Sequence, residues 1–350
     1  MLDSLLSAKI TIPASLALAL LVVIIMLALV IWSVKRHRDP KLDVECGQPL
    51  DELIPSLSGL THSTRVEGNT VEIFENGAYF DALFEEIASA RRSVHFETYL
   101  WQEGKLGDRL AETLAERARA GVKVRVLLDA SGCKKMGEAA CHKLEEAGCK
   151  VARYHAPRLR NIGVLNRRDH RKLAVLDGRV ALAGGHCIVD TWLGQAQDKE
   201  HFRDISVRLR GPIVHAVQSA FSENWVDETG ELFVGDDVFP RLDAAGDITM
   251  HVARVKPERA APAVKILHHL VLCVARHKIW IQNPYFVPDA EAIKAMADAV
   301  RRGVDVRVMV PSTGASDMPI VQHAAHHNSN ACSPPACASS NIRRRCSIRR

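Results

Sequence analysis

The chain has 350 residues, of which 47% are apolar and 25% charged, so it is long enough for two ordinary domains and is not a disordered protein. Its 46 basic and 41 acidic residues give a net charge of +5, which does not indicate a nucleic-acid-binding protein. Nine cysteines without C-x-x-C spacing fit a reducing compartment better than a disulfide framework, and we expect no zinc site.

An uncharged apolar run occupies residues 10–32, and about 20 such residues suffice to cross a bilayer. The run is longer than the apolar region of a cleavable signal peptide, which has about 7 to 15 residues. We therefore expect one uncleaved transmembrane helix after a short segment, residues 1–9, with a buried helix of a soluble protein as the alternative. More basic residues follow the run than precede it, which predicts that the rest of the chain is cytoplasmic: Lys35, Arg36 and Arg38 against Lys9.

The next segment, residues 33–67, contains several prolines and glycines and shows no sustained periodicity, so we expect a linker. Strand and helix patterns then alternate. Short strands are predicted at 71–74, 93–101 and 122–129, with helices at 79–92 and 106–120. This alternation favours an α/β lobe with a largely parallel sheet, which we place at residues 68–235.

The chain then repeats part of this pattern. ARRSVHFETYLW, a helix and GVKVRVLLD are followed later by ARHKIWIQNPYFVP, a helix and GVDVRVMVPS. The spacing from tyrosine to glycine is 22 residues in the first copy, Tyr99 to Gly121, and 18 in the second, Tyr285 to Gly303. The pattern favours an internal duplication with a partial second lobe at residues 236–330, and two unrelated βαβ units are the alternative.

The densest group of chemically active residues lies in RDHRKLAVLDGRVALAGG, where His170, Lys172 and Asp177 form H-x-K-x4-D. Asp177-Gly178 between two apolar runs predicts a hairpin, and His170 and Lys172, two residues apart on its first strand, should face the same side. A lysine charge suits phosphate oxygens and an imidazole can attack phosphorus, so we interpret these residues as catalytic, with Asp177 holding the geometry. A basic strand end facing water is the alternative.

Three further positions are candidates for the same site. Gly184 and Gly185 end the hairpin, where backbone can approach a substrate closely. Glu97 lies on the strand after a repeat helix, where it would either orient the catalytic histidine beside the substrate or be a buried structural carboxylate. Asp129 ends an apolar strand, where functional groups are common in α/β folds, although capping the next segment would also explain it.

These motifs resemble the phospholipase D superfamily, and their surroundings are similar to bacterial cardiolipin synthases. The resemblance covers about residues 67–330 and includes HFETYLW, RDHRK, DGRVALAGG, HFRDISVRLRG and NPYFVPD. It implies an α/β fold of two similar lobes, each a mixed sheet flanked by helices, that share one site without a metal or cofactor. It also implies that each lobe supplies one H-x-K-x4-D, one histidine forming a phosphohistidine and the other protonating the leaving alcohol.

For this chain the resemblance implies phosphatidyl transfer between two phosphatidylglycerol molecules at the inner (plasma) membrane by a single-pass protein. The expected partners are phosphatidylglycerol or another anionic phospholipid and the membrane. A homodimer is left open, and nucleic acid is not expected. The alternatives are a membrane-bound phospholipase D-type phosphodiesterase or nuclease and a non-catalytic truncated product.

The chain also departs from the family pattern. Cys187 occupies a position where many members have Asn, and the sequence contains one H-x-K-x4-D. Equal spacing in the second copy would place the next histidine near position 352. Residues 331–350 are rich in Cys, Ser, Pro and Arg, which we interpret as the result of a changed reading frame, a disordered basic tail being the alternative. Because general acid catalysis contributes about 10² to 10⁴ in rate, we expect impaired activity.

Overall fold

The computed structural model describes residues 13–35, 49–61, 64–156, 167–254, 263–310 and 346–349. The N-terminal helix belongs to one compact unit and the two sheets belong to another. Helix α1 (Ala14–Lys35) contains a 19-residue stretch of mean hydropathy 3.2, Ala14–Trp32, which is long and apolar enough to cross a membrane. This helix covers the predicted anchor, apart from residues 10–12, which lie outside the described ranges.

Part of the segment predicted to be a linker is regular. Helix α2 (Leu50–Thr61) contains Pro55, and strand β1 (Arg65–Glu75) begins before the expected strand at 71–74. The prolines suggested irregular backbone, but Leu57 of α2 is buried and the helix packs against α7 (Ala263–Val274). Tertiary packing thus stabilises a helix that local propensity disfavours. Residues 36–48 and 62–63 of the predicted linker lie outside the described residues.

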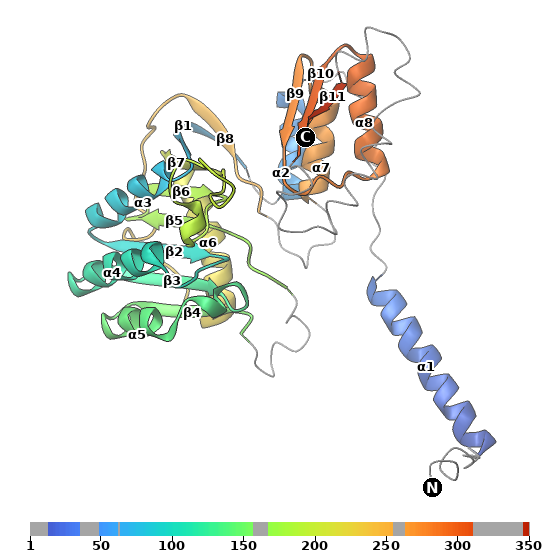
Figure 1. The fold of residues 1–350 in the computed structure, drawn as a ribbon, viewed down its shortest axis with the longest axis horizontal. Coiled ribbons are helices and arrows are strands. Elements are labelled where there is room, and N and C mark those ends of the chain that lie inside the picture. Colours follow the sequence, from blue (N-terminus) through green and yellow to red (C-terminus); the bar gives the residue numbers. More distant parts are fainter. Residues whose placement is uncertain are drawn as a thin grey trace. The chain divides into compact units, whose positions relative to one another are not determined.

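The first lobe contains an eight-stranded sheet in the order β4-β3-β2-β5-β6-β7-β1-β8 (Figure 1). The remaining strands are β2 (Ser93–Thr98), β3 (Lys123–Asp129), β4 (Lys150–Tyr154), β5 (Leu173–Leu176), β6 (Val180–Gly184), β7 (Ile205–Arg210) and β8 (Ile248–His251). Strands β2, β3 and β4 are parallel, whereas β5, β6, β7, β1 and β8 pair antiparallel.

The mixed sheet confirms the fold that the resemblance implied and corrects the largely parallel sheet expected from alternation alone. The change begins at β5, which enters the sheet antiparallel to β2. The tight turn at Asp177-Gly178 then reverses the chain again between β5 and β6, so the strands of this sheet after β4 pair antiparallel. The hairpin predicted around this turn is present.

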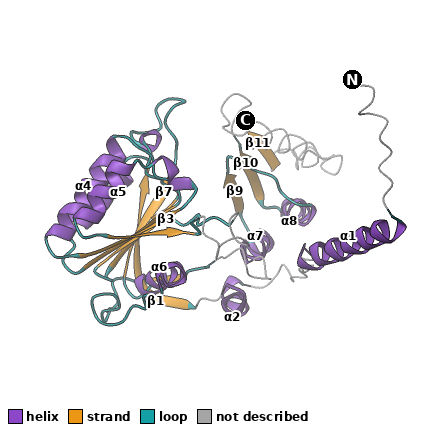
Figure 2. Cartoon of the chain, turned by 90° about the horizontal axis from the view of Figure 1, so that it is seen from below, coloured by secondary structure: helices purple, strands orange, loops and turns teal. Residues whose placement is uncertain are grey.

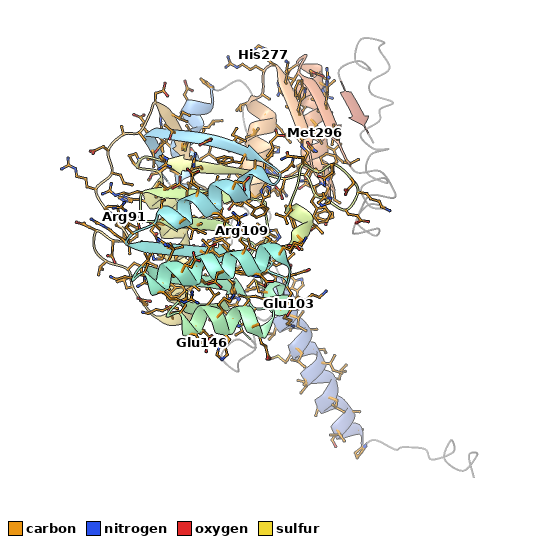
Figure 3. All side chains as sticks on the ribbon, turned by 60° about the vertical axis from the view of Figure 1, so that its left-hand side comes forward. Arg91, Glu103, Arg109, Glu146, His277 and Met296 are labelled. Carbon is orange, nitrogen blue, oxygen red and sulfur yellow. The ribbon has the colours of Figure 1, made fainter. Side chains whose placement is uncertain are left out.

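Helices cover both faces of this sheet (Figure 2). On one face lie α3 (Ala78–Ser89), α4 (Lys105–Arg119) and α5 (Glu138–Glu146), which contribute to one buried cluster, and on the other lies α6 (Val214–Thr229). Their apolar sides form two buried clusters whose largest fully buried side chains include Trp101 and Phe80 on the first face and Trp225 and Phe221 on the second. The exposed sides are polar, as Arg109 on α4 and Glu146 on α5 illustrate (Figure 3). A rigid platform therefore holds the strand ends where the candidate residues lie.

The second sheet repeats the start of the first lobe. This part of the chain runs through α7, β9 (Lys278–Gln282), α8 (Ala290–Arg301) and β10 (Asp305–Met309). Strands β9 and β10 are parallel, as β2 and β3 are. Three residues separate helix from strand in α7-β9 and α8-β10, as in α3-β2 and α4-β3. This matches the duplication predicted from sequence. A short strand, β11 (Cys346–Arg349), pairs parallel with β10, and residues 311–345, which include most of the predicted tail, lie outside the described residues.

Candidate active site

His170 and Lys172 lie in the segment directly before β5, beside the carboxyl ends of the parallel strands β2 and β3. The Nζ atom of Lys172 lies 3.2 Å from Nδ1 of His170 and donates a 2.7 Å hydrogen bond to the carbonyl oxygen of His170. His170 is exposed, whereas Lys172 is buried. The structure therefore brings the two residues together as predicted, although they precede the strand on which the sequence placed them.

Tyr99, which follows β2, contributes a third side chain to this group. Its ring centroid lies 4.4 Å from that of the His170 imidazole, and Nζ of Lys172 lies 5.1 Å from the same tyrosine centroid. In the sequence Tyr99 marks the first copy of the repeat, and it was not predicted to belong to the site. Its position after a buried strand, at the edge where parallel strands end, was the signal that could have identified it.

The electrostatic environment favours an uncharged imidazole. Partial burial, and then the nearby ammonium group of Lys172, lower the pKa of His170 below its ordinary value. Burial also lowers the pKa of Lys172. A neutral imidazole keeps a lone pair on one ring nitrogen, which a nucleophile requires, and the lysine supplies charge for an anionic group.

Asp169 and Arg171, which alternate with His170 and Lys172 in this segment, hold the segment in place from its other side. The backbone N–H of Asp169 donates to Oδ2 of Asp129 at 2.8 Å, and the guanidinium of Arg171 donates to Glu223 on α6 at 2.8 Å and to a carbonyl oxygen of the same helix. Because successive side chains of extended backbone point in opposite directions, this anchoring presents His170 and Lys172 on the opposite face.

Asp129, at the end of β3, connects two segments. Its Oδ1 accepts hydrogen bonds from the backbone N–H groups of Ser131 at 3.0 Å and Gly132 at 2.7 Å, and its Oδ2 accepts the bond from Asp169. Asp129 thus caps the segment after β3, as one of the two sequence interpretations proposed. Through Asp169 it also holds the backbone that carries His170.

Glu97 lies on β2 with 0% of its surface exposed. Its Oε1 accepts a 2.7 Å hydrogen bond from Nδ2 of Asn224 on α6. Burial, followed by the charge of Asp169, raises the pKa of Glu97 well above its ordinary value. Glu97 is therefore placed on the Asp169 side of the segment, and the structure does not bring it to the face that carries His170.

The glycine pair lies close to the site. The backbone N–H of Gly184 donates to the carbonyl oxygen of Lys172 at 3.3 Å. A Cβ atom on Gly184 would lie 2.0 Å from Oγ of Ser206, and one on Gly185 would lie 2.1 Å from Oδ1 of Asp204. The neighbouring strand β7 and the residue before it therefore explain both glycines by close packing, whereas contact with a substrate stays a prediction.

Asp177 lies at the opposite end of β5 from His170. It has a positive φ of 53° at the turn between β5 and β6. Its carboxylate accepts hydrogen bonds from the backbone N–H groups of Arg91, Arg92 and Ser93, the shortest being 2.7 Å from Arg92. The structure does not bring Asp177 to His170 and Lys172. It places the carboxylate where it fixes the start of β2.

Two further residues lie near Lys172, of which the sequence identified Cys187 as a departure from the family pattern and did not identify Asp204. Asp204, before β7, accepts a 2.9 Å hydrogen bond from Nε1 of Trp192 and acts electrostatically on Lys172. Cys187 also lies near Lys172, and burial raises the pKa of the Cys187 thiol to about 11. A neutral thiol at this position supplies no charge to the site at neutral pH.

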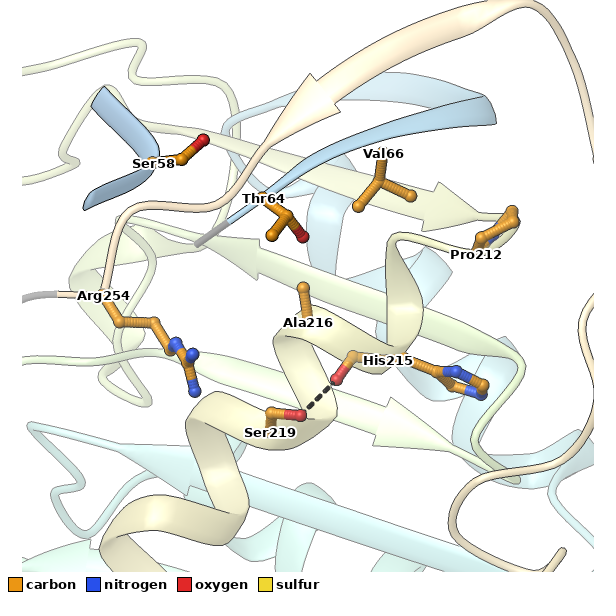
Figure 4. A pocket seen from close by; sticks show the side chains of 8 residues that line it. All are labelled: Ser58, Thr64, Val66, Pro212, His215, Ala216, Ser219 and Arg254. Carbon is orange, nitrogen blue, oxygen red and sulfur yellow. Dashed lines mark hydrogen bonds between the residues drawn. The ribbon is translucent and has the colours of Figure 1, made fainter. Parts of the chain in front are cut away.

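A cavity of about 430 Å³ lies beside the first half of α6 (Figure 4). It is lined by Ser58, Thr64, Val66, Pro212, His215, Ala216, Ser219 and Arg254. Two of its hydroxyl groups already donate to helix carbonyls, Ser58 to Ile54 and Ser219 to His215, and neither His170 nor Lys172 lines it. We assign no function to this cavity. Within the described ranges, no group of three or more His, Cys, Asp or Glu side chains is arranged to hold a metal ion.

Comparison with known sequences identifies a family. A family model described as "Cardiolipin synthase, PLD-like domain" matches residues 83–225 and 271–334. The major cardiolipin synthase of Bacillus subtilis (strain 168) is 32% identical over 265 residues, which are 75% of this chain and 55% of that protein. A cardiolipin synthase of Listeria welshimeri is 31% identical over 284 residues, 80% of this chain and 56% of the relative. The chain thus spans about half the length of these curated relatives.

Comparison with solved structures supports the fold. The phosphatidylserine synthase of Haemophilus influenzae superposes with a TM-score of 0.59 over 85% of this chain and 76% of that protein. Its sequence is 13% identical, so the likeness concerns the fold alone. The segments matched by the family model include both copies of the repeat and the H-x-K-x4-D motif.

Proposed function

Because the chain belongs to the cardiolipin synthase, PLD-like domain family, we propose that it is a phosphatidyltransferase whose nucleophile is His170. The observation that carries the proposal is an exposed imidazole with a lowered pKa whose Nδ1 lies 3.2 Å from the ammonium nitrogen of Lys172. A nucleophile and a cation held together at the ends of parallel strands suit attack on a phosphodiester.

In the proposed reaction a ring nitrogen of His170 forms a bond to the phosphorus of phosphatidylglycerol. The bond from phosphorus to the glycerol head group breaks, and glycerol leaves after taking up a proton. A glycerol hydroxyl of a second phosphatidylglycerol then attacks the phosphohistidine, loses its proton, and releases His170 and cardiolipin. The role of Lys172 is to stabilise the negative charge on the non-bridging phosphate oxygens in both steps.

The proton for the leaving glycerol distinguishes this sequence from a two-motif enzyme. The 350 residues contain one H-x-K-x4-D, so they supply one such histidine. We therefore propose that the chain reacts about 10² to 10⁴ times more slowly than an enzyme that also has the general acid. A homodimer in which a second copy provides this histidine is the alternative, and it predicts a rate that rises with the square of the protein concentration when dimers are scarce.

The apolar helix α1 supports a location in the inner (plasma) membrane, where anionic phospholipid is available. The excess of basic residues after this helix favours a cytoplasmic catalytic lobe on a single-pass anchor. The proposed substrate is accordingly phosphatidylglycerol or another anionic phospholipid in the same membrane.

The direct test is a lipid transfer assay with the full chain in mixed micelles that contain phosphatidylglycerol, with cardiolipin and free glycerol measured by mass spectrometry. We expect slow formation of both products by the wild-type chain and none by His170→Asn. His142→Asn is the matched control, since His142 is an exposed histidine on α5 that pairs with Glu146.

Single-stranded DNA in a parallel reaction tests the other activity of the superfamily. Cleavage of DNA without lipid products would replace the proposal with a nuclease function. Equal product formation by the wild-type chain and His170→Asn would show that another group carries the reaction.

A further inference from the structure

A small buried polar layer lies between the His170 segment and helix α6. It contains Glu97 from β2, Asp169 from the segment before β5 and Asn224 from α6, whose exposed fractions are 0%, 3% and 3%. Burying two carboxyl groups beside each other is costly when both are ionised, because desolvation and like-charge repulsion add. The protonation of this pair therefore decides how the layer is held together.

The hydrogen bonds of the two carboxyl groups leave one oxygen of each without a partner. Glu97 uses Oε1 to accept from Asn224 at 2.7 Å, and Asp169 uses Oδ1 to accept from the backbone N–H of Arg171 at 3.1 Å. Oε2 of Glu97 and Oδ2 of Asp169 are buried and have no hydrogen-bond donor in the described part of the chain. The two side chains are nevertheless within interaction distance of each other. Two carboxylates cannot bond, whereas one added proton satisfies both oxygens.

The surroundings indicate which residue carries that proton. Asp169 accepts a hydrogen bond from the backbone N–H of Arg171, which favours its ionised form, and its own backbone N–H donates to Asp129. Glu97 has the neutral amide of Asn224 as its hydrogen-bonded neighbour. The charge of Arg171 opposes protonation of Glu97, but this guanidinium is also paired with Glu223 at 2.8 Å. The neutral form therefore suits Glu97.

We infer that Glu97 is a positioning residue that keeps its acid proton at neutral pH and donates it to Oδ2 of Asp169. The shared proton joins β2 to the segment that presents His170 and Lys172 on its other face. The directions of the pKa values agree, because burial and the charge of Asp169 raise the pKa of Glu97. The consequence for catalysis rests on the proposed role of His170, whereas the shared proton itself does not.

Infrared spectroscopy tests the shared proton without requiring activity. The full chain in detergent micelles should show, at neutral pH, the C=O stretch of a protonated carboxylic acid in a difference spectrum against Glu97→Gln. Glutamine preserves the geometry, because its amide can donate to Asp169 while its oxygen accepts from Asn224. Glu112→Gln is the matched control, since Lys143 and Arg119 hold the pKa of this exposed carboxyl group low. A neutral-pH spectrum of the wild-type chain without the acid band of Glu97 would overturn the inference.

A second variant keeps the test decisive if Glu97→Gln does not fold. Asp169→Asn removes the neighbouring charge and offers an amide donor, so the acid band of Glu97 should disappear at lower pH than in the wild-type chain. An unchanged titration midpoint in Asp169→Asn would overturn the pairing.

The positioning role has its own readout. The yield of phosphatidyl adduct on His170 should fall on the alkaline side in both chains as Lys172, whose pKa burial lowers, loses its proton. The wild-type chain should show an additional fall at the pH where the acid band of Glu97 disappears, and this additional fall should be absent in Glu97→Gln. The same alkaline profile in both chains would overturn the positioning role. If no variant forms an adduct, the proposed reaction fails, the positioning role fails with it, and the infrared result still decides the shared proton.

Discussion

Replacement of Asp177 separates a structural role from a catalytic one. Its carboxylate accepts backbone hydrogen bonds from Arg91, Arg92 and Ser93, and its φ of 53° lies in the left-handed region. Asp177→Ala leaves three donors without their acceptor and puts a β-carbon that lacks a polar group into an unfavourable conformation. Water can reach the N–H groups of Arg91 and Arg92 but less easily that of Ser93, so we expect a loss of about 2–4 kcal/mol.

Two further variants resolve the contributions. Asp177→Asn keeps an acceptor oxygen and tolerates the left-handed conformation, so it should be the mildest. Asp177→Gly removes the acceptor, but glycine adopts the left-handed conformation readily. Its free energy of unfolding should lie between those of the Asn and Ala variants, about 1 kcal/mol above that of Asp177→Ala. The measurement is urea unfolding of the full chain in micelles, followed by tryptophan fluorescence.

A loss below about 0.5 kcal/mol in Asp177→Ala, within the range of ordinary surface substitutions, would refute the structural role. Loss of the His170 adduct at unchanged stability would show instead that Asp177 acts on the reaction.

Three other predictions concern charge and packing near the site. Burial lowers the pKa of His95 to about 4, so as the pH falls this imidazole is protonated in the unfolded chain before it is protonated in the folded chain. The free energy of unfolding should therefore fall by up to about 3 kcal/mol between about pH 6.5 and 4. Urea unfolding should show a smaller fall in His95→Gln, and an equal fall would contradict the assignment. Gly184→Ala should lower the free energy of unfolding by about 1–3 kcal/mol, because the added Cβ would lie 2.0 Å from a hydroxyl oxygen of β7. Gly59→Ala is the control, since its Cβ would have nothing within 4 Å and should cause no clash, and equal thermal unfolding temperatures of the two variants would disprove the packing argument. Lys172→Met should raise the pKa of His170, because the lysine charge is one cause of its lowered value; an unchanged midpoint in an NMR titration of the imidazole would contradict this cause.

The elements of the first lobe that carry strong local patterns could be predicted from the sequence. Helix α4 was expected at 106–120 and runs from Lys105 to Arg119, and the hairpin was identified from Asp177-Gly178. The repeated order of helix and strand in the second sheet was also foreseen. These features depend on periodicity and turn chemistry over a few residues, which a sequence displays directly.

The features of the fold and the site that the sequence did not predict depend on contacts between residues far apart in the chain. Packing against α7 stabilises α2 despite Pro55, and no local pattern announces that contact. The sequence suggested that Asp177 holds the geometry of the His170 site. The two residues are seven positions apart, however, and seven residues of extended chain span about 23 Å. The polar layer joins Glu97 to Asn224, which are 127 residues apart, so its partners could not be read from spacing.

The most direct test of the proposed reaction is to look for the covalent intermediate. The full chain is incubated with phosphatidylglycerol micelles, quenched under conditions that preserve phosphohistidine, digested, and analysed by mass spectrometry. We predict a phosphatidyl group on the peptide that contains His170, absent in His170→Asn and retained in the control His142→Asn. An unmodified His170 peptide in a chain that still releases glycerol, or an adduct on a different residue, would contradict the account.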